Sequence, residues 1–256
     1  QEEKNHKISN KNYELIEKEE DIDKWLNEAE ESGEIAVDTE TSSLDPHQAK
    51  LVGISFSTKI GKACYIPIGH TEGKNLEEKK VIKKIKPVLE DKSIKKIGQN
   101  IKFDYIIFYH KGINMNAMED TMLMSYVLDA GKNRHNMDEL SEIHLDHKTI
   151  TFKDIVGTGK KQINFSQVKI DIAKDYAAED ADITLRLHQL LKPRLVQEHM
   201  VTLYERLERP LAPVLARMES VGIKVERAAL ARLSEDFAQR IAALEEEIHR
   251  LAGRTF

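Results

Sequence analysis

A short apolar strand that ends in two acids is the feature that most restricts how this chain can fold. Ile35, Ala36 and Val37 read as the end of a buried strand, and Asp38 and Glu40 follow at once. Side chains alternate along a strand, so these two carboxylates share one face of a sheet. At about 5 Å and an effective dielectric of about 20, they repel by roughly 3 kcal/mol. A bound cation or a raised carboxyl pKa would make the arrangement tolerable.

Short β-rich runs alternate with helical segments over the first 200 residues, which predicts an α/β fold with a mixed sheet flanked by helices. Three consecutive runs separated by turn residues predict an antiparallel meander at 34–40, 50–58 and 63–69. Further short strands are expected at 13–16 and 95–100. Amphipathic or apolar periodicity predicts helices at 19–33, 77–90, 101–112, 120–131 and 168–200.

The sequence changes character after about residue 200. Apolar residues recur at spacings of three and four between 230 and 251, which predicts one helical stripe. A shorter helix precedes it, opened by Pro210 and stopped at Gly222. We therefore expect a C-terminal helical hairpin in a second region, 201–256, after a first domain at 1–200 whose residues 1–12 are frayed. Lysine dominates before residue 181 and arginine after it, which leaves open that two sequence sources meet there.

Charge and cysteine content narrow the functional class. The net charge of −5 argues against a broad basic nucleic-acid surface, although a local basic rim remains compatible with it. The single cysteine, Cys64, cannot form an intramolecular disulfide and suits a reducing cytoplasm. No apolar run approaches membrane-spanning length, so we expect no membrane partner.

Further acids recur where strands end or helices begin. Asp104 lies shortly after the strand at 95–100, and Tyr176 precedes Asp180 by four residues in helical sequence, so these two share a helix face. Four carboxylates and a phenol form an oxygen-rich site suited to Mg²⁺ or Mn²⁺. Two such cations about 4 Å apart could activate water and stabilise the leaving oxygen of a phosphodiester. Each piece alone is weak, and their order and contexts together make the case.

Three segments carry a family resemblance: DTETSSLD, IGQNIKFD and YAAEDADIT. They resemble the three exonuclease motifs of bacterial DNA polymerase I, the family A polymerases, in the tyrosine-bearing branch of the four-acid exonucleases. The similarity runs from about residue 32 to the C-terminus, through RHNMDELSE, HKTITF and RLERPLAPVLARMESVGIKVE. It implies a ribonuclease H-like fold and a bacterial, cytoplasmic 3′–5′ proofreading exonuclease that releases nucleoside 5′-monophosphates from DNA 3′ ends.

The resemblance also implies roles for individual residues. Asp38, Glu40 and Asp180 are expected to bind the first of two divalent cations, Mg²⁺ with Mn²⁺ as a substitute. Asp38 would bridge to the second cation, which Asp104 would reach largely through water. Tyr176 would orient the attacking water.

Substrate contacts follow from the same resemblance. Leu44 and Phe165 match apolar residues that wedge against the terminal bases, and Gln99, Asn100 and Arg134 resemble polar contacts. The expected partner is DNA with a single-stranded or frayed 3′ end.

Other nearby acids are expected to stay outside the site. Asp182 is close to Asp180, but the spacing of four from the tyrosine selects Asp180. Glu179, Asp45 and Asp146 are expected to be solvated or capping residues.

The stretch after residue 200 resembles the opening helices of a polymerase domain, near the base of its thumb. The resemblance implies that the rest of that domain and its active site lie outside this chain, so the chain would shorten a primer and not extend it.

Three alternatives stay open. The first is RNA 3′-end trimming, as in ribonuclease D, which shares the acids and the tyrosine. The second is an inactive fragment that only supports a polymerase, although that would be expected to have lost an acid. The third is a partner-binding role for the helical hairpin.

Overall fold

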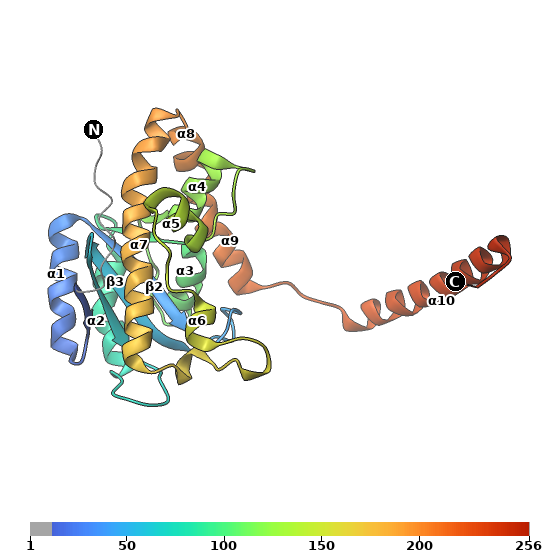
Figure 1. The fold of residues 1–256 in the computed structure, drawn as a ribbon, viewed down its shortest axis with the longest axis horizontal. Coiled ribbons are helices and arrows are strands. Elements are labelled where there is room, and N and C mark those ends of the chain that lie inside the picture. Colours follow the sequence, from blue (N-terminus) through green and yellow to red (C-terminus); the bar gives the residue numbers. More distant parts are fainter. Residues whose placement is uncertain (1–11, 256) are drawn as a thin grey trace. The chain divides into compact units, whose positions relative to one another are not determined.

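The computed structural model describes residues 12–255, and its first compact unit is a six-stranded sheet with helices on both faces (Figure 1). The strand order is β1-β4-β3-β2-β5-β6. β2, β3 and β4 are antiparallel, which confirms the predicted meander, whereas β1, β5 and β6 join in parallel. The strands are β1 Tyr13–Leu15, β2 Glu34–Thr41, β3 Leu51–Lys59, β4 Lys62–Pro67, β5 Lys95–Gly98 and β6 Met118–Asp120.

Helices cover both faces of this sheet. One face packs against α1 (Ile22–Ser32), α2 (Glu78–Glu90) and α3 (Ile101–His110) around the largest hydrophobic core. The opposite face carries the long helix α7 (Ile170–Gln197), which also packs against α4 (Thr121–Asp129) and α5 (Met137–Leu145). The short helix α6 (Phe152–Val156) lies beside α7. The mixed sheet flanked by helices confirms the predicted fold class.

The alternation of side chains along β2 decides where its acids point. Ile35 and Val37 belong to the core beneath α1 and α2, whereas Ala36 packs on the face that α7 covers. Successive side chains of a strand point to opposite faces. Asp38 and Glu40 therefore share the α7 face with Ala36.

Small residues let α7 approach the sheet closely. Ala173, Ala177, Ala178 and Ala181 are fully buried on this helix. Because alanine adds only a methyl group, the backbone of α7 can lie near the strands, and polar side chains on the same turns can reach the end of β2.

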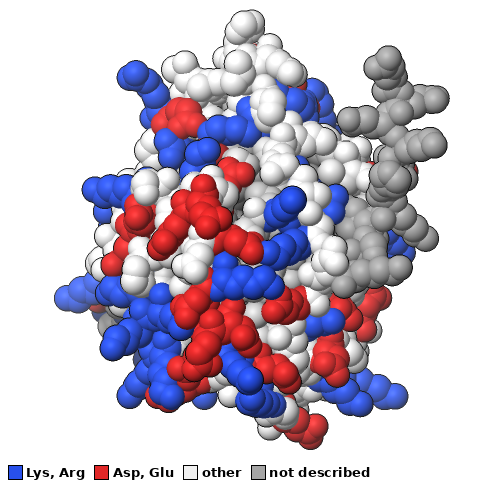
Figure 2. All heavy atoms as spheres, turned by 90° about the vertical axis from the view of Figure 1, so that its left-hand side faces the viewer, with Lys and Arg blue, Asp and Glu red and all other residues white. Residues whose placement is uncertain are grey.

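The α1–α2 side of the molecule carries charges of both signs. Figure 2 shows basic and acidic side chains interspersed over this face. Ion pairs join α2 to α1, as between Lys84 and Asp23, and to the short 3-10 helix (Glu19–Asp21) before α1, as between Lys80 and Glu19. This face therefore offers no broad basic surface to a nucleic acid.

The chain divides into two compact units, Gln1–Ser220 and Val221–Phe256. The domain boundary predicted near residue 200 rests on a change in sequence character, whereas the compact units divide after Ser220. Tyr204 and Ala216 are fully buried in the cores of the first unit. After α7 the first unit continues through α8 (Val201–Leu203), a π-helix (Tyr204–Glu208) and α9 (Arg209–Val221).

The second unit is a single helix, α10 (Arg227–Ala252). Both helices of the expected hairpin are thus present, and Gly222 follows α9 with the positive φ of a helix stop. The apolar stripe of α10 is exposed, with side chains 48% to 71% accessible at Leu230, Leu233, Phe237, Ile241, Leu244, Ile248 and Leu251. In residues 12–255 no helix combines the length and apolar character of a membrane span.

Candidate active site

A pocket of about 430 Å³ opens where β2 ends, between α3 and α7. Its lining includes the four acids and the tyrosine selected from the sequence. These five residues come from β2, α3 and α7, and they are Asp38, Glu40, Asp104, Tyr176 and Asp180. The fold therefore brings together residues that lie more than a hundred positions apart.

Three of the acids form a tight group. Asp38, Glu40 and Asp180 each offer a carboxylate oxygen, and these atoms all lie within 4.8 Å of one another. Asp104 stands apart from this group and is held by Thr39, whose backbone N–H and hydroxyl donate to Asp104 Oδ1 at 3.0 and 2.6 Å. Thr39 occupies the strand position between the two β2 acids, so its side chain points to the α3 side of the sheet.

Burial and mutual repulsion change the acidity of the group. Asp38 keeps part of its surface open to the pocket, but burial raises its pKa to about 6, against a backbone hydrogen bond from Thr39 that lowers it. Burial also raises the pKa of Glu40 well above its ordinary value, and the charges of Asp38, Asp180 and Asp104 add to the rise. The pKa values of Asp104 and Asp180 are raised by burial and then by the charge of Asp38.

The chemistry of these residues fits a divalent cation. Glu40 Oε1 is buried and has no hydrogen-bond partner among residues 12–255. A buried acceptor without a donor is costly, and a cation would supply what the protein does not. Carboxylate oxygens at this spacing match the hard ligands that Mg²⁺ and Mn²⁺ prefer.

Tyr176 borders the acids from one helical turn away. It lies one turn before Asp180 on α7, and the two side chains interact. Burial and the Asp180 charge raise the pKa of the phenol, so the hydroxyl stays protonated and can donate a hydrogen bond. The centroid of the Tyr176 ring lies 6.0 Å from the centroid of the Phe165 ring.

Aromatic and aliphatic side chains form the other wall of the pocket. Leu44 is 92% exposed, whereas Phe165 is only 2% exposed and packs behind Phe152. The two phenylalanine rings stack with planes 9° apart at 6.3 Å, and Phe152 is 40% exposed. Sequence reasoning did not select Phe152, although it lies inside the quoted segment HKTITF and directly follows the capping residue Thr151 of α6.

The three predicted polar contacts differ in position. Gln99 and Asn100 line the pocket, at the turn between β5 and α3. Arg134 does not line it and instead borders a separate hollow with Asn136 and Glu139.

The neighbouring acids on α7 serve other purposes. Asp182 is fully buried outside the pocket, where it accepts hydrogen bonds from the Tyr13 hydroxyl at 2.9 Å and the Gly61 N–H at 2.7 Å. The expectation that Glu179 is solvated or capping is wrong. Glu179 is 2% exposed, contacts His147 Nε2 at 2.9 Å and accepts a hydrogen bond from the Ile150 N–H at 2.6 Å. It thereby fixes the segment that leads to Phe152.

Comparison with known proteins adds a family to this geometry. A family model described as 3′–5′ exonuclease matches residues 13–196. DNA polymerase I of Rhizobium leguminosarum is 46% identical over 92% of this chain and 25% of its own length. DNA polymerase I of Pseudomonas aeruginosa is 41% identical over 95% of this chain and 28% of its own length. The chain thus spans about a quarter of the length of these curated relatives.

Solved structures share the fold. Brucella melitensis NrnC aligns with a TM-score of 0.60 and 24% identity over 74% of this chain and 86% of its own. The same protein bound to pGG aligns with a TM-score of 0.58 and 25% identity over 74% of this chain and 86% of its own. The POL domain of Pol1 from M. smegmatis, in complex with DNA primer-template and dNTP, aligns with a TM-score of 0.73 and 19% identity over 95% of this chain and 38% of its own.

Proposed function

We propose, because this chain belongs to the 3′–5′ exonuclease family of bacterial DNA polymerase I, that it hydrolyses the terminal phosphodiester of DNA 3′ ends and releases nucleoside 5′-monophosphates. The observation that carries the proposal is the group of three carboxylates within 4.8 Å, with Asp104 in the same pocket. A site so rich in negative charge would repel a phosphate unless cations accompanied it.

Two divalent cations, Mg²⁺ or Mn²⁺, are the proposed cofactors. Asp38, Glu40 and Asp180 would hold one, and Asp38 and Asp104 would hold the other. When bound, the cations would make water more acidic and offset the charge that develops on the leaving 3′-oxygen. The Thr39 hydrogen bonds keep Asp104 turned into the pocket, so the acids need little rearrangement to bind them.

Tyr176 is proposed to orient the attacking water. Its raised pKa leaves the hydroxyl protonated, and its place beside Asp180 puts that hydroxyl at the edge of the acid group. A water held there would face the phosphorus of a nucleotide bound to the acids, which favours in-line attack.

We expect Tyr176→Phe to be milder than Asp180→Ala. The first change removes one hydrogen bond, worth roughly a threefold to tenfold loss of rate, whereas the second removes a proposed cation ligand and should cost more than about a hundredfold. Cleavage of 5′-labelled single-stranded DNA with Mg²⁺ measures both. Equal losses in the two variants would contradict this division of roles.

The apolar wall of the pocket favours an unpaired 3′ end as substrate. Leu44 and Phe152 present exposed apolar groups in the pocket that holds the acids, where an unpaired terminal base could stack on them. Stacking of a base on an aromatic ring contributes roughly 1–3 kcal/mol and accepts any base. We therefore propose single-stranded or frayed DNA ends as the preferred partner.

Phe152→Ala should raise the KM for single-stranded DNA by about fivefold or more, because a stacking surface is lost while the acids stay in place. Tyr126→Ala is the matched control, since Tyr126 is an aromatic residue 52% exposed on α4 and outside the pocket. Steady-state cleavage with a range of DNA concentrations separates KM from kcat. An unchanged KM in Phe152→Ala, or equal wild-type rates on single strands and blunt matched duplex, would count against the proposed role.

A time course on 5′-labelled single-stranded DNA with Mg²⁺, Mn²⁺ and EDTA tests the proposed function. Stepwise shortening that requires the cation is the expected result, and no cleavage under any condition would favour the inactive fragment. RNA of the same sequence and a dinucleotide belong in the same panel, because NrnC, which is 25% identical, was solved bound to pGG. Faster cleavage of RNA would favour the RNA-trimming alternative.

The wider context of the chain is also a proposal. The relatives that it matches are about four times longer and carry the name DNA polymerase I. We propose that residues 201–256 form the first helices of a polymerase domain, whose remainder is the partner of the exposed α10 stripe, in the bacterial cytoplasm.

A further inference from the structure

We infer that Asp120 is a positioning residue of the pocket, which caps helix α3 in place of Asn100 and so leaves the Asn100 side chain available to the substrate. The inference rests on the proposed function, because it assigns a task to one wall of the same pocket. It concerns a residue that lies behind the pocket and does not line it.

The turn between β5 and α3 has an unusual cap. Asn100 occupies the N-cap position, where an asparagine side chain ordinarily accepts a hydrogen bond from the first turn, yet its side chain makes no such bond. Its backbone is left-handed, with φ of 60°. The N–H groups of Asn100 and of Ile101, the first residue of α3, are bound from another segment, since Asp120 Oδ1 accepts from the Asn100 N–H and Oδ2 from the Ile101 N–H, both at 3.0 Å.

The same carboxylate also begins helix α4. Asp120 is the N-cap of α4 and accepts a hydrogen bond from the Met122 N–H at 2.9 Å. One buried side chain, 3% exposed, therefore serves the N-termini of two helices. Helix N-termini favour negative charge, so both ends contribute to holding the carboxylate in place.

The two amides of this turn are left in different states. Gln99 is held at both ends of its amide, because Nε2 donates to the His135 carbonyl at 2.7 Å and Oε1 accepts from the Thr121 hydroxyl at 2.5 Å. Asn100 is exposed at the pocket, and none of its side-chain atoms is needed for the cap. Of the two, Asn100 is thus the amide that can turn to a nucleotide.

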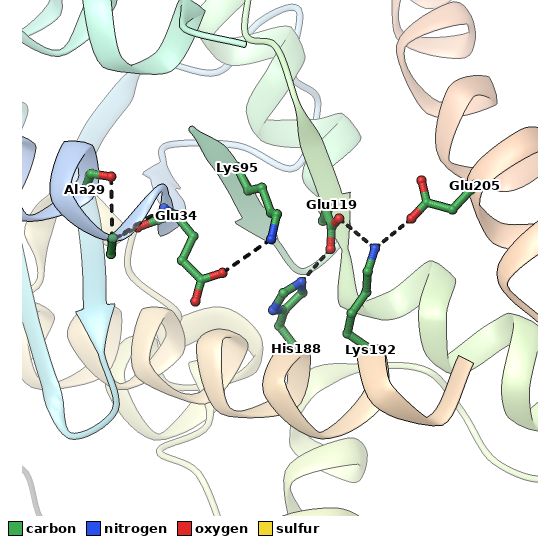
Figure 3. A network of polar contacts seen from close by, with 8 residues as sticks. Ala29, Glu34, Lys95, Glu119, His188, Lys192 and Glu205 are labelled. Carbon is green, nitrogen blue, oxygen red and sulfur yellow. Dashed lines mark hydrogen bonds and ion pairs between the residues drawn. The ribbon is translucent and has the colours of Figure 1, made fainter. Parts of the chain in front are cut away.

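The strand that carries Asp120 is anchored from α7 and the π-helix. The Asp120 N–H donates to the hydroxyl of the fully buried Tyr204 at 3.0 Å. The preceding residue, Glu119, contacts His188 and Lys192, and Lys192 also reaches Glu205 (Figure 3). β6 therefore cannot shift without breaking these contacts. They hold the backbone of Asp120, and with it the carboxylate, in one position.

The first test asks whether the Asn100 side chain contributes to DNA binding but not to the stability of the fold. Asn100→Gly is the suitable change, because glycine tolerates the positive φ that would strain alanine. We expect an unchanged Tm and about fivefold weaker binding of single-stranded DNA, the loss of about one hydrogen bond. A fall in Tm of several degrees, as for a lost cap, would overturn the inference.

The second test asks whether Asp120 acts through Asn100. Asp120→Asn leaves one acceptor oxygen where two are used, so the turn loosens and DNA binding should weaken by about fivefold. The double variant Asn100→Gly/Asp120→Asn should bind no more weakly than the weaker single variant. Losses that multiply, or normal binding by Asp120→Asn, would contradict the assignment.

Binding is measured by fluorescence anisotropy of labelled single-stranded DNA in Ca²⁺ instead of Mg²⁺, so that a cation offsets the charge of the acids, and an unchanged length of the DNA at the end shows that the signal does not depend on cleavage. A wild-type protein that binds but never cleaves would end the proposed function and leave this inference standing. Asp182→Asn is the control, because Asp182 is also a buried carboxylate outside the pocket, where it accepts hydrogen bonds from the Gly61 N–H, the Tyr13 hydroxyl and Arg186 Nε. It should lower Tm without changing affinity. Should Asp120→Asn fail to fold, Asp120→Glu takes its place, because it keeps the charge and both acceptor oxygens but moves them by one methylene group; weaker DNA binding that Asn100→Gly does not worsen supports the inference, and losses that multiply overturn it.

Discussion

Replacing Asp38 with alanine is expected to lower the rate of DNA cleavage by roughly a thousandfold or more, while the fold stays intact. Asp38 belongs to the group of three carboxylates and is the acid whose charge raises the pKa values of Glu40, Asp104 and Asp180. It therefore interacts with every other acid of the site, as Glu40 also does. Its loss would weaken both proposed cation positions at once.

Single-turnover cleavage of 5′-labelled single-stranded DNA at saturating Mg²⁺ measures this effect. Asp171→Ala is the control, because Asp171 is an exposed acid on α7 that does not line the pocket. Circular dichroism should give the same spectrum for both variants. Near-normal cleavage by a folded Asp38→Ala protein would refute the assignment of the acid group as the catalytic centre.

The metal-free protein is expected to become less stable as the pH rises from about 4 to about 6, and Mg²⁺ should reduce this dependence. The pKa of Asp38 is about 6 in the folded protein, against an ordinary value of 3.8. The folded state therefore keeps a proton that the unfolded chain has already released, and the free energy of unfolding falls as the pH rises. The full difference for this one group is about 3 kcal/mol.

Thermal melts between about pH 4 and pH 8, in EDTA and in Mg²⁺, measure the effect. Asp38→Asn cannot ionise at this position, so its Tm in EDTA should decline less than that of the wild type and should exceed it near pH 8. Asp171→Asn should follow the wild type. A wild-type curve in EDTA that rises over this range relative to Asp38→Asn would show that burial does not raise the pKa of this carboxyl.

The sequence predicted most strongly what depends on spacing along a single element. The alternation along β2 put Asp38 and Glu40 on one face, and the interval of four on α7 paired Tyr176 with Asp180. The meander β2–β3–β4 followed from runs separated by turn residues. These features are local, so the chain itself carries enough information to place them.

What could not be predicted depends on contacts between distant segments. Phe152 stacks on Phe165, and Glu179 of α7 binds the segment that leads to Phe152; no local pattern records either contact. Arg134 lies in the sequence between the site residues Asp104 and Tyr176, but it lines a separate hollow. Strand β6 has only three residues, too few for an alternation, and is defined by its pairing with β5.

The position of each acid around the axis of helix α7 decides which part of the protein that acid contacts. Glu179, Asp180 and Asp182 lie within a single helical turn, yet one fixes a loop, one joins the acid group and one anchors β1. Each residue advances a helix by about 100°, so a single insertion between Tyr176 and Glu179 would rotate all three acids away from their present partners. Changes of length should therefore be tolerated in the exposed loop at 157–163 and rejected in α7, whatever residue is inserted.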